Sequence, residues 1–325
     1  MASLVERFRD RLPLPQGAAV VSLGEGSTPL LPAPRLSEEL GCALFLKWEG
    51  ANPTGSFKDR GMTVAVSCAL ARGARGLVCA STGNTAASAA AYAARAGIPA
   101  VVLQPAGAVA IGKVAQALAA GARLLEVRGS FDQALDAARG LAERGDHVLV
   151  NSLNPHRLEG QKTAALELIE ELGRTPDVVA LPYGGGGNTR AYALGFDEAG
   201  TGLPRIVAAQ AAARAETVAT AIRIPQPPHR AEAEAAVARS GGAVVSVSDD
   251  AVLAAWRDVA RLEGLFCEPA SAAGLAALRR DPPRGATVVC VLTGHGLKDP
   301  ETARRAARPP VTVEPDADAI AAAVA

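Results

Sequence analysis

Short apolar, β-branched runs alternate with longer, alanine-rich stretches along most of the chain. The short runs are typical of buried strands and the longer stretches of helices. Strands are expected at residues 44–47, 76–80, 100–103, 123–127, 147–150, 178–181, 205–208, 243–247 and 287–292, and the helices include 59–71, 85–96, 131–143 and 157–172. This order predicts an α/β protein with largely parallel sheets, whose ligands bind in loops beyond the carboxyl ends of the strands.

Two segments depart from this rhythm. Residues 211–242 are rich in Ala, Arg and Glu and contain the stretch IPQPPHR, which favours a surface insertion with some helix. The tail after Pro309 is sparse in structural signals, and we expect an arm or a frayed end there. With 325 residues, the chain has room for two domains or for one large α/β unit.

Composition narrows the class of protein. Aromatic residues make up 3% of the chain and hydrophobic residues 49%, so the core must be built mainly from Ala, Val and Leu. Lys plus Arg and Asp plus Glu number 33 each, and this zero net charge argues against nucleic acid as the main partner. The five cysteines are scattered without a C-x-x-C pair, which argues against a disulfide framework. Cys79 and Cys290 lie in apolar runs, and we expect them to be buried.

Targeting and metal-binding signals are weak. No apolar run reaches the roughly 18 residues that a membrane-spanning helix requires. The N-terminal stretch is charged and lacks the apolar centre of a signal peptide, so we expect a cytoplasmic protein with no membrane partner. His147, His156 and His229 do not cluster with cysteines or carboxylates at metal-ligand spacings, and no metal site is predicted.

The stretch NPTGSFKDRGM places one lysine, Lys58, between a turn and the expected start of a helix. Amine chemistry needs a lysine that is partly neutral, and both an apolar neighbour such as Phe57 and a helix N-terminus favour the neutral amine. Lys58 is therefore a candidate for holding a carbonyl cofactor as a Schiff base. A lysine that only caps a surface turn is the alternative.

Four consecutive glycines, Gly184 to Gly187, follow an expected strand and precede a helix that opens at Asn188. Glycine lets the backbone approach a phosphate closely, and the helix N-terminus favours negative charge. The loop is neither G-x-G-x-x-G nor a P-loop, because no Gly-Lys-Ser/Thr follows. It predicts a phosphate-binding loop and, by itself, leaves a nucleotide open as the ligand.

Two other loops offer groups for anions. The first joins a strand to a helix and contains Ser81, Thr82, Gly83, Asn84 and Thr85. Its backbone N–H groups could bind a carboxylate, with plain helix capping as the alternative. The second loop carries Ser152 and Arg157. The guanidinium fork of Arg157 suits a phosphate or a carboxylate, and an arginine on the surface of a capped helix is the alternative.

The stretch CVLTGHGLKDP ends an expected buried strand in Thr293. A hydroxyl at this place could form a hydrogen bond with a ring nitrogen. His295 lies between two glycines, where it could serve as a base. A structural histidine in a turn is the alternative for His295.

Seven motifs in chain order resemble those of threonine synthases. They are GEGSTPL (24–30), NPTGSFKDRGM (52–62), STGNTAAS (81–88), NPHRLEGQKTAA (154–165), GGGGNTRAYALGF (184–196), EPASAAGLAAL (268–278) and TGHGLKDP (293–300). Threonine synthases are pyridoxal phosphate enzymes of fold type II, the tryptophan synthase β-like fold. The resemblance implies two open, mostly parallel twisted sheets flanked by helices. It also implies a small domain at 52–148, a large cofactor-binding domain formed by 1–51 and 149–325, and a homodimer with a complete site in each protomer's cleft.

The resemblance implies roles for the matching residues. The cofactor would be held by Lys58 (also the catalytic proton shuttle), Phe57, Asn84, Gly184, Gly185, Gly186, Gly187, Asn188 and Thr293. The substrate carboxylate would meet Ser81, Thr82, Gly83 and Thr85, and the substrate phosphate would meet Ser152, Arg157, Thr85 and Asn188. Glu268 and Ser271 match a motif that lines the cofactor pocket. A threonine at the ring nitrogen leaves that nitrogen largely unprotonated, so Lys58 and the surrounding dipoles must do more to stabilise carbanions.

The implied reaction converts O-phospho-L-homoserine and water to L-threonine and phosphate, and it needs two anion sites. The GGGGN loop departs from the GNAGN form that threonine synthases usually carry and looks more like that of threonine and serine dehydratases. Those relatives usually lack KDRG and TGHGLKD. A dehydratase or another β-replacement enzyme of the same fold stays open. So does, in a different class, a non-catalytic protein that binds phosphate or a nucleotide.

Overall fold

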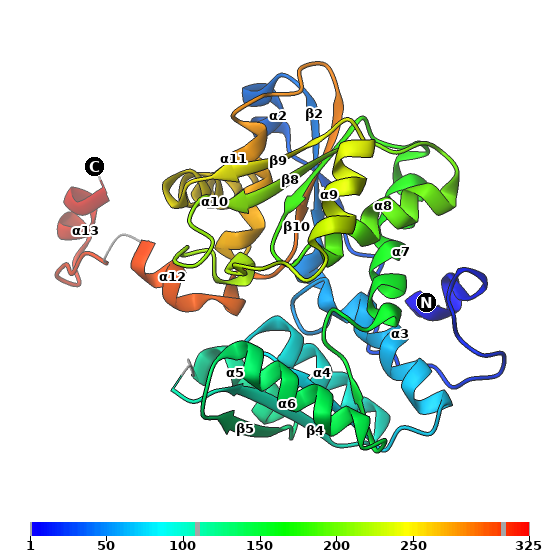
Figure 1. Ribbon diagram of the computed structural model, residues 1–325. Helices are drawn as coiled ribbons and strands as arrows, with labels where there is room; N and C mark the ends of the chain where they lie inside the picture. The colour runs from blue at the N-terminus through cyan, green and yellow to red at the C-terminus, as the bar shows by residue number, and fades with distance from the viewer. Residues whose placement is uncertain (1, 108–110, 307–309, 325) are drawn as a thin grey trace.

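The computed structural model describes residues 2–107, 111–306 and 310–324, which form two open sheets flanked by helices (Figure 1). The larger sheet has the strand order β1-β2-β10-β7-β8-β9, and the smaller sheet has the order β5-β4-β3-β6. Neighbouring strands are parallel in both sheets, except that β1 and β2 are antiparallel. The predicted α/β class with two mostly parallel sheets is confirmed.

The elements have the following bounds. The larger sheet contains β1 (Leu30–Pro32), β2 (Ala43–Trp48), β7 (Val178–Pro182), β8 (Arg205–Ala211), β9 (Ala243–Val247) and β10 (Thr287–Leu292), and the smaller contains β3 (Gly76–Ala80), β4 (Ala100–Pro105), β5 (Arg123–Val127) and β6 (His147–Leu149). The helices are α1 (Leu4–Arg7), α2 (Pro34–Leu40), α3 (Lys58–Ala71), α4 (Asn84–Ala96), α5 (Ile111–Ala119), α6 (Phe131–Glu143), α7 (Pro155–Leu172), α8 (Gly187–Ala199), α9 (Arg230–Arg239), α10 (Asp249–Glu263), α11 (Ala273–Leu278), α12 (Pro300–Ala306) and α13 (Ala317–Val324). Short 3₁₀ turns are η1 (Arg9–Arg11), η2 (Glu49–Ala51), η3 (Thr220–Ile222), η4 (Pro269–Ala272) and η5 (Gly296–Lys298).

Helices cover both faces of the larger sheet (Figure 1). Successive side chains of a strand point to opposite faces. In β10, Cys290 and Leu292 pack in a core with α2, α10 and α11, whereas Val289 and Val291 pack in a second core with α7, α8 and α9. Because both faces are buried, such a strand is apolar throughout rather than alternating. This explains why the short apolar runs predicted these strands well.

Glycines let three helices cross at very short distance. A Cβ atom placed on Gly61 of α3 would lie 2.5 Å from the carbonyl oxygen of Arg157 in α7. One on Gly160 of α7 would lie 2.0 Å from the carbonyl oxygen of Arg60 in α3, and one on Gly195 of α8 would lie 2.4 Å from the carbonyl oxygen of Lys162. No side chain fits at these points, so the helix backbones touch. The crossing brings the start of α3 next to the start of α7.

All nine expected strands and the four named helices are present, with shifted ends. Three helices begin one or two residues earlier than expected, at Lys58, Asn84 and Pro155. Proline suits a first helical position because its missing N–H would have no partner there. The sequence did not indicate β1, because three residues ending in Pro32 carry no measurable periodicity.

The prediction of a surface insertion with some helix at 211–242 is only partly correct, because the segment contains α9 and many exposed side chains but also buried ones. Thr217 and Ala219 are fully buried, Ile222 and His229 are nearly so, and the segment leading to α9 packs over the glycine loop. The carboxylate of Asp249 accepts a hydrogen bond of 2.9 Å from the backbone of Val218 and anchors the segment. Small and polar residues fill these buried positions, so the composition resembled that of a surface. The tail contains α13, none of whose described side chains is buried, which agrees with the expected arm rather than with a frayed end.

All five cysteines are buried and free, as expected for Cys79 and Cys290. Within the described ranges, none of the helices combines the length and the apolar character that crossing a bilayer requires. The same ranges contain no group of three or more His, Cys, Asp and Glu side chains arranged to hold a metal ion.

Candidate active site

Hydrogen bonds join the loops that carry the predicted site residues. The backbone N–H of Phe57 donates to the carbonyl oxygen of Thr293 at 3.0 Å. The side-chain amide of Asn84, at the start of α4, donates to the Glu268 carboxylate at 3.1 and 3.2 Å. These bonds connect the segment after β2 and the loop after β3 with segments that flank the larger sheet, at the edge where ligands of parallel sheets bind.

Lys58 is the first residue of α3, and its Nζ atom lies 4.4 Å from the centre of the Phe57 ring. Loss of water around the amine and the positive charge of Arg157 lower the pKa of Lys58 to about 7, while the negative charge of Glu268 opposes this shift. A large fraction of the amine is therefore neutral near neutral pH. The neutral amine is the protonation state that both attack on an aldehyde and proton abstraction require.

Asp59 fixes the turn that presents Lys58. It is fully buried, and its carboxylate accepts hydrogen bonds from the backbone N–H of Thr54 at 2.7 Å, the hydroxyl of Thr54 at 2.6 Å and the hydroxyl of Ser88 at 2.6 Å. Ser88 belongs to α4, so Asp59 also connects α3 to α4. The sequence analysis gave Asp59 no separate role, although a carboxylate in the first turn of a helix was a usable signal.

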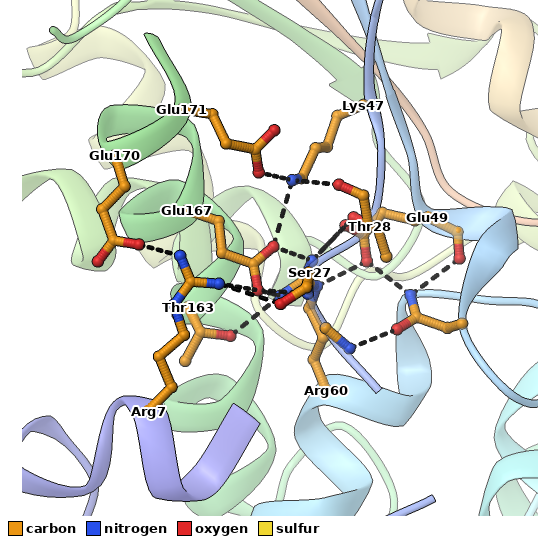
Figure 2. A network of polar contacts seen from close by, with 12 residues as sticks. Arg7, Ser27, Thr28, Lys47, Glu49, Arg60, Thr163, Glu167, Glu170 and Glu171 are labelled. Carbon is orange, nitrogen blue, oxygen red and sulfur yellow. Dashed lines mark hydrogen bonds and ion pairs between the residues drawn. The ribbon is translucent and has the colours of Figure 1, made fainter. Parts of the chain in front are cut away.

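Arg60 lies in a buried network of charges (Figure 2). Its Nε donates to Glu49 at 2.7 Å, and its Nη1 donates to Glu167 at 2.8 Å. The Nζ atom of Lys47 lies 3.2 Å from Glu167. Burial would raise the pKa of Glu167, but the charges of Arg60 and Lys47 outweigh it and lower that pKa to about 2. Two cations and two carboxylates thus balance in the interior.

The network ties the N-terminal segment to the two helices that cross at the site. Arg60 is on α3, Glu167 is on α7, and Thr28 accepts a hydrogen bond of 2.9 Å from Arg60 Nη2. The backbone N–H of Ser27, held at φ 46°, donates to Glu167 at 2.8 Å. Arg60 is two residues from Lys58 in the first turn of α3, so the network fixes the position of the helix start that carries Lys58. In the sequence, KDRG stands out only as a motif, and nothing in it indicates this function of Arg60.

Arg157 is buried at the start of α7, which rules out the surface arginine considered above. Its Nη1 donates to the carbonyl oxygen of Val150 at 2.7 Å. Its Nε and Nη2 are buried without a hydrogen-bond partner among the described residues. Burial lowers the pKa of Arg157 to about 10, with Cys79 and Asp59 opposing the shift. A buried guanidinium with two unused donors fits an anion.

The glycine loop presents unused donors at the start of α8. The Nδ2 atom of Asn188 and the hydroxyl of Thr189 are buried without partners in the described part of the chain. Gly186 adopts φ 82°, which strongly favours glycine, and a Cβ atom there would lie 3.0 Å from the carbonyl oxygen of His229. A Cβ atom on Gly184 would lie 3.2 Å from the Cα atom of Ile222. The glycines therefore also permit the segment before α9 to pack against the loop.

Asn84 and Thr293, which were expected to contact the cofactor ring, lie in a polar cluster with Glu268 and Ser271. Thr293 Oγ1 is 3.0 Å from Ser271 Oγ, which accepts a hydrogen bond of 2.9 Å from the backbone N–H of Gly294. Burial raises the pKa of Glu268 to about 7, against the hydrogen bond from Asn84. The pKa values of Glu268 and Lys58 are therefore both about 7. From the sequence, Glu268 was expected only to line the cofactor pocket.

Two predicted groups follow the more ordinary alternative. The Ser81 hydroxyl accepts hydrogen bonds of 3.2 Å from the backbone N–H groups of Gly83 and Ala86, which is a local capping arrangement. His295 Nδ1 accepts a hydrogen bond of 3.1 Å from the backbone N–H of Leu297, as a structural histidine in a turn does. Thr82, Gly83 and Thr85 are partly exposed, as residues that bind a substrate must be.

The comparisons with known proteins identify the family. A family model described as pyridoxal-phosphate dependent enzyme matches residues 21–294. The chain is 49% identical over 320 residues to the threonine synthase of Halalkalibacterium halodurans, covering 92% of this chain and 90% of that protein. It is 51% identical over 322 residues to the threonine synthase of Mycobacterium leprae, covering 92% of this chain and 89% of that protein. The chain belongs to the threonine synthase family.

Solved structures with other activities share this fold. The L-serine ammonia-lyase of the fungus Rhizomucor miehei is 24% identical, with a TM-score of 0.76, covering 89% of this chain and 100% of that chain. Maize serine racemase is 23% identical, with a TM-score of 0.75, covering 91% of this chain and 94% of that chain. At this level of identity, the likeness shows the fold and does not separate a threonine synthase from these enzymes.

Pyridoxal phosphate, the cofactor of threonine synthases, fits the groups at the site. The start of α8 and the unused donors of Asn188 and Thr189 suit a phosphate. Lys58 has the low pKa that binding an aldehyde requires. Phe57, beside Lys58, offers an apolar surface for the ring. Thr189 is the one of these that the sequence analysis missed, because a threonine after a glycine run looks like an ordinary helix residue.

Proposed function

We propose that this member of the threonine synthase family converts O-phospho-L-homoserine and water into L-threonine and phosphate. The observation that carries the proposal is the buried guanidinium of Arg157, with two unused donors close enough to Lys58 to lower its pKa. Such a group calls for an anion besides the cofactor phosphate. A dehydratase acting on serine or threonine has no substrate phosphate and would leave this buried charge without a partner.

The residues have the following proposed roles. The cofactor, once bound, supplies the electron sink that stabilises carbanions. Lys58 holds it through Nζ, Gly184 to Asn188 hold its phosphate, and Asn84 and Thr293 meet the polar atoms of its ring. The loop from Thr82 to Thr85 binds the substrate carboxylate, and Ser81 supports this loop through its hydrogen bonds with Gly83 and Ala86. Ser152, Arg157, Thr85 and Asn188 bind the substrate phosphate.

The mechanism follows from the neutral amine of Lys58. Nζ takes the proton from the substrate Cα and later one from Cβ, which its pKa of about 7 allows near neutral pH. Arg157 stabilises the phosphate as the Cγ–O bond breaks and the negative charge on the leaving group grows. The two protons that Nζ removed return to Cγ and Cα. Water adds its hydroxyl group at Cβ, and its other proton goes to the released phosphate. Glu268, which hydrogen-bonds Asn84, helps to set the charge around the amine.

We further propose the division into a small domain at 52–148 and a large domain formed by 1–51 and 149–325. Every strand of the smaller sheet lies within residues 76–149, which supports the boundary at 148 to within one residue. A cavity of about 410 Å³ is lined by Thr54, Gln116 and His295, from both proposed domains. We also propose the homodimer that the family resemblance implies, which sedimentation velocity tests, and the cytoplasmic location expected from the sequence.

The purified protein should show an absorbance band near the visible edge and release phosphate from O-phosphohomoserine. The measurement is an absorption spectrum before and after substrate addition, with phosphate followed in parallel. A band without phosphate release, together with turnover of serine or threonine, would identify a dehydratase. No band after adding pyridoxal phosphate would overturn the enzyme proposal and favour a phosphate-binding protein.

Replacing Arg157 with Ala should raise the KM for O-phosphohomoserine by about 100-fold, because charge-assisted hydrogen bonds to the substrate phosphate are lost. Steady-state phosphate release measures this. Arg157→Lys is the matched control, since it keeps the charge without the planar fork and should recover only part of the loss. A KM unchanged in Arg157→Ala would remove Arg157 from the substrate site.

The rate at which the apoenzyme takes up pyridoxal phosphate should rise with pH and pass its midpoint near pH 7. The pKa of Lys58 is lowered to about 7, so the neutral, reactive amine predominates above that pH and the charged amine below it. The variant Glu268→Gln removes a negative charge that raises the pKa of Lys58, so its midpoint should lie at lower pH. A midpoint above pH 9 would contradict the desolvated amine.

A further inference from the structure

His229 connects the two loops that we assign to the two phosphate groups. It is 5% exposed, and it precedes α9 at the end of the segment that packs over the glycine loop. Its backbone N–H donates to the carbonyl oxygen of Gly185 at 3.1 Å. Its ring atom Nε2 lies 2.9 Å from the carbonyl oxygen of Ser152. One buried residue thus contacts a carbonyl in each loop.

The chemistry of the neighbours determines the form of the ring. The carbonyl oxygen of Ser152 can only accept, so Nε2 carries the hydrogen. On the other side, Nδ1 lies 3.5 Å from Nη1 of Arg190, and a guanidinium can only donate. Both contacts suit the neutral ring with its hydrogen on Nε2. A Cβ atom on Gly187 would lie 3.3 Å from His229 Cδ2, so the ring also packs directly against the glycine loop.

A carbonyl oxygen facing an anion is unfavourable, because its dipole directs negative charge toward the anion. In each of the two loops, one carbonyl oxygen accepts a hydrogen bond from His229: that of Gly185 and that of Ser152. We propose that His229 is a positioning residue that turns the Ser152 carbonyl away from the phosphate site and sets the spacing between this loop and the glycine loop. The inference rests on the proposed function only in naming the anion as the substrate phosphate.

A substitution of His229 can remove one of its two contacts and keep the other. The bond to Gly185 comes from the backbone and survives any side-chain substitution except proline. The bond to Ser152 comes from the ring and is lost on truncation. Removing the ring should therefore disturb the substrate phosphate site, which loses a hydrogen bond, more than the cofactor phosphate site, which loses only the packing contact with Gly187. A residue that merely stabilised the fold would affect both sites together.

The variants His229→Ala, His229→Gln and His229→Asn test this in the holoenzyme. His229→Ala should raise the KM for O-phosphohomoserine and the dissociation constant of inorganic phosphate by about tenfold, the usual loss for one hydrogen bond. The affinity of the apoenzyme for pyridoxal phosphate should stay within about twofold of wild type. Glutamine carries an N–H donor as many bonds from Cα as Nε2, so His229→Gln should restore both constants. Asparagine is too short to reach Ser152, so His229→Asn should behave like alanine.

Three results would overturn the proposal. They are an unchanged phosphate dissociation constant in His229→Ala, a glutamine variant no better than asparagine, and a parallel loss of pyridoxal phosphate affinity in His229→Ala. The last would mark the ring as support for the whole segment. Phosphate binding is measured by calorimetry without turnover. It therefore tests His229 even if the wild-type enzyme released no phosphate, which would reject the proposed reaction instead.

Discussion

The variant Lys58→Ala should lose at least about 10³-fold in kcat, because proton transfer by a positioned side chain contributes factors of this order. It should also lose the absorbance band near the visible edge, since no other lysine is placed at the start of α3. Turnover is measured by phosphate release with pyridoxal phosphate in excess, and the band by absorption spectroscopy. We expect the two effects together, because the proposal assigns to one amine both the binding of the cofactor and the transfer of the protons.

Lys58→Arg is the control for charge. Its guanidinium stays protonated at any accessible pH and offers no neutral amine, so it should be as inactive as alanine. Thermal melting shows whether the loss of activity in these variants comes from the missing amine or from unfolding. The amine of Lys58 takes part in none of the hydrogen bonds described above, and its burial disfavours the charged form, so Lys58→Ala should melt within a few degrees of the wild-type apoenzyme. Substantial turnover by Lys58→Ala, without an added amine, would remove Lys58 from catalysis.

The variant Glu167→Gln should lower the free energy of unfolding by about 3–5 kcal/mol, because it leaves buried cations without their partner. Glu167 is fully buried and faces both Arg60 and Lys47 (Figure 2). Glutamine has nearly the same shape, so the loss reports the charge rather than a cavity. Urea denaturation of the apoenzyme measures it.

Glu234→Gln is the matched control, because the ion pair of Glu234 with Arg230 is exposed and i,i+4 on a helix. It should change the unfolding free energy by less than about 0.5 kcal/mol. The pH dependence gives a second test. The pKa of Glu167 is lowered to about 2 in the folded protein, so its stabilisation is complete above its unfolded pKa of about 4.3 and is lost as the pH falls toward 2. Glu167→Gln should lack this part of the acid transition, and equal stability of Glu167→Gln and wild type at pH 7 would contradict the network's role.

Much of the site could be predicted because its residues come in short, local motifs. Lys58 follows a turn and starts a helix, and Gly184 to Asn188 join a strand to a helix, so each lies within one stretch of sequence. Parallel sheets bring such loops to one edge, so their grouping follows from the order of strands and helices along the chain. The roles of Ser81 and His295 were left open there, and their local hydrogen bonds favour the structural alternatives.

Other features depended on contacts between distant parts of the chain. The pairing of Arg60 with Glu167 spans 107 positions, and that of His229 with Ser152 spans 77. No local pattern marks such a partner, because a charge that is buried and paired looks in sequence like one on a surface. For the same reason, the segment before α9 resembled a surface insertion, although its small and polar residues pack over the glycine loop.

The sequence by itself determined the class of fold, the order of the strands along the chain and the motifs of the threonine synthase family. These follow from hydrophobic patterning and from residues a few positions apart, which local backbone geometry governs. Only the tertiary structure decided that Arg157 is buried with unused donors, that Arg60 is neutralised by two carboxylates and that His229 contacts the carbonyl oxygens of both Ser152 and Gly185. Burial and electrostatic pairing depend on helices that cross where Gly61 and Gly160 let their backbones touch, and that approach exists only in the folded chain.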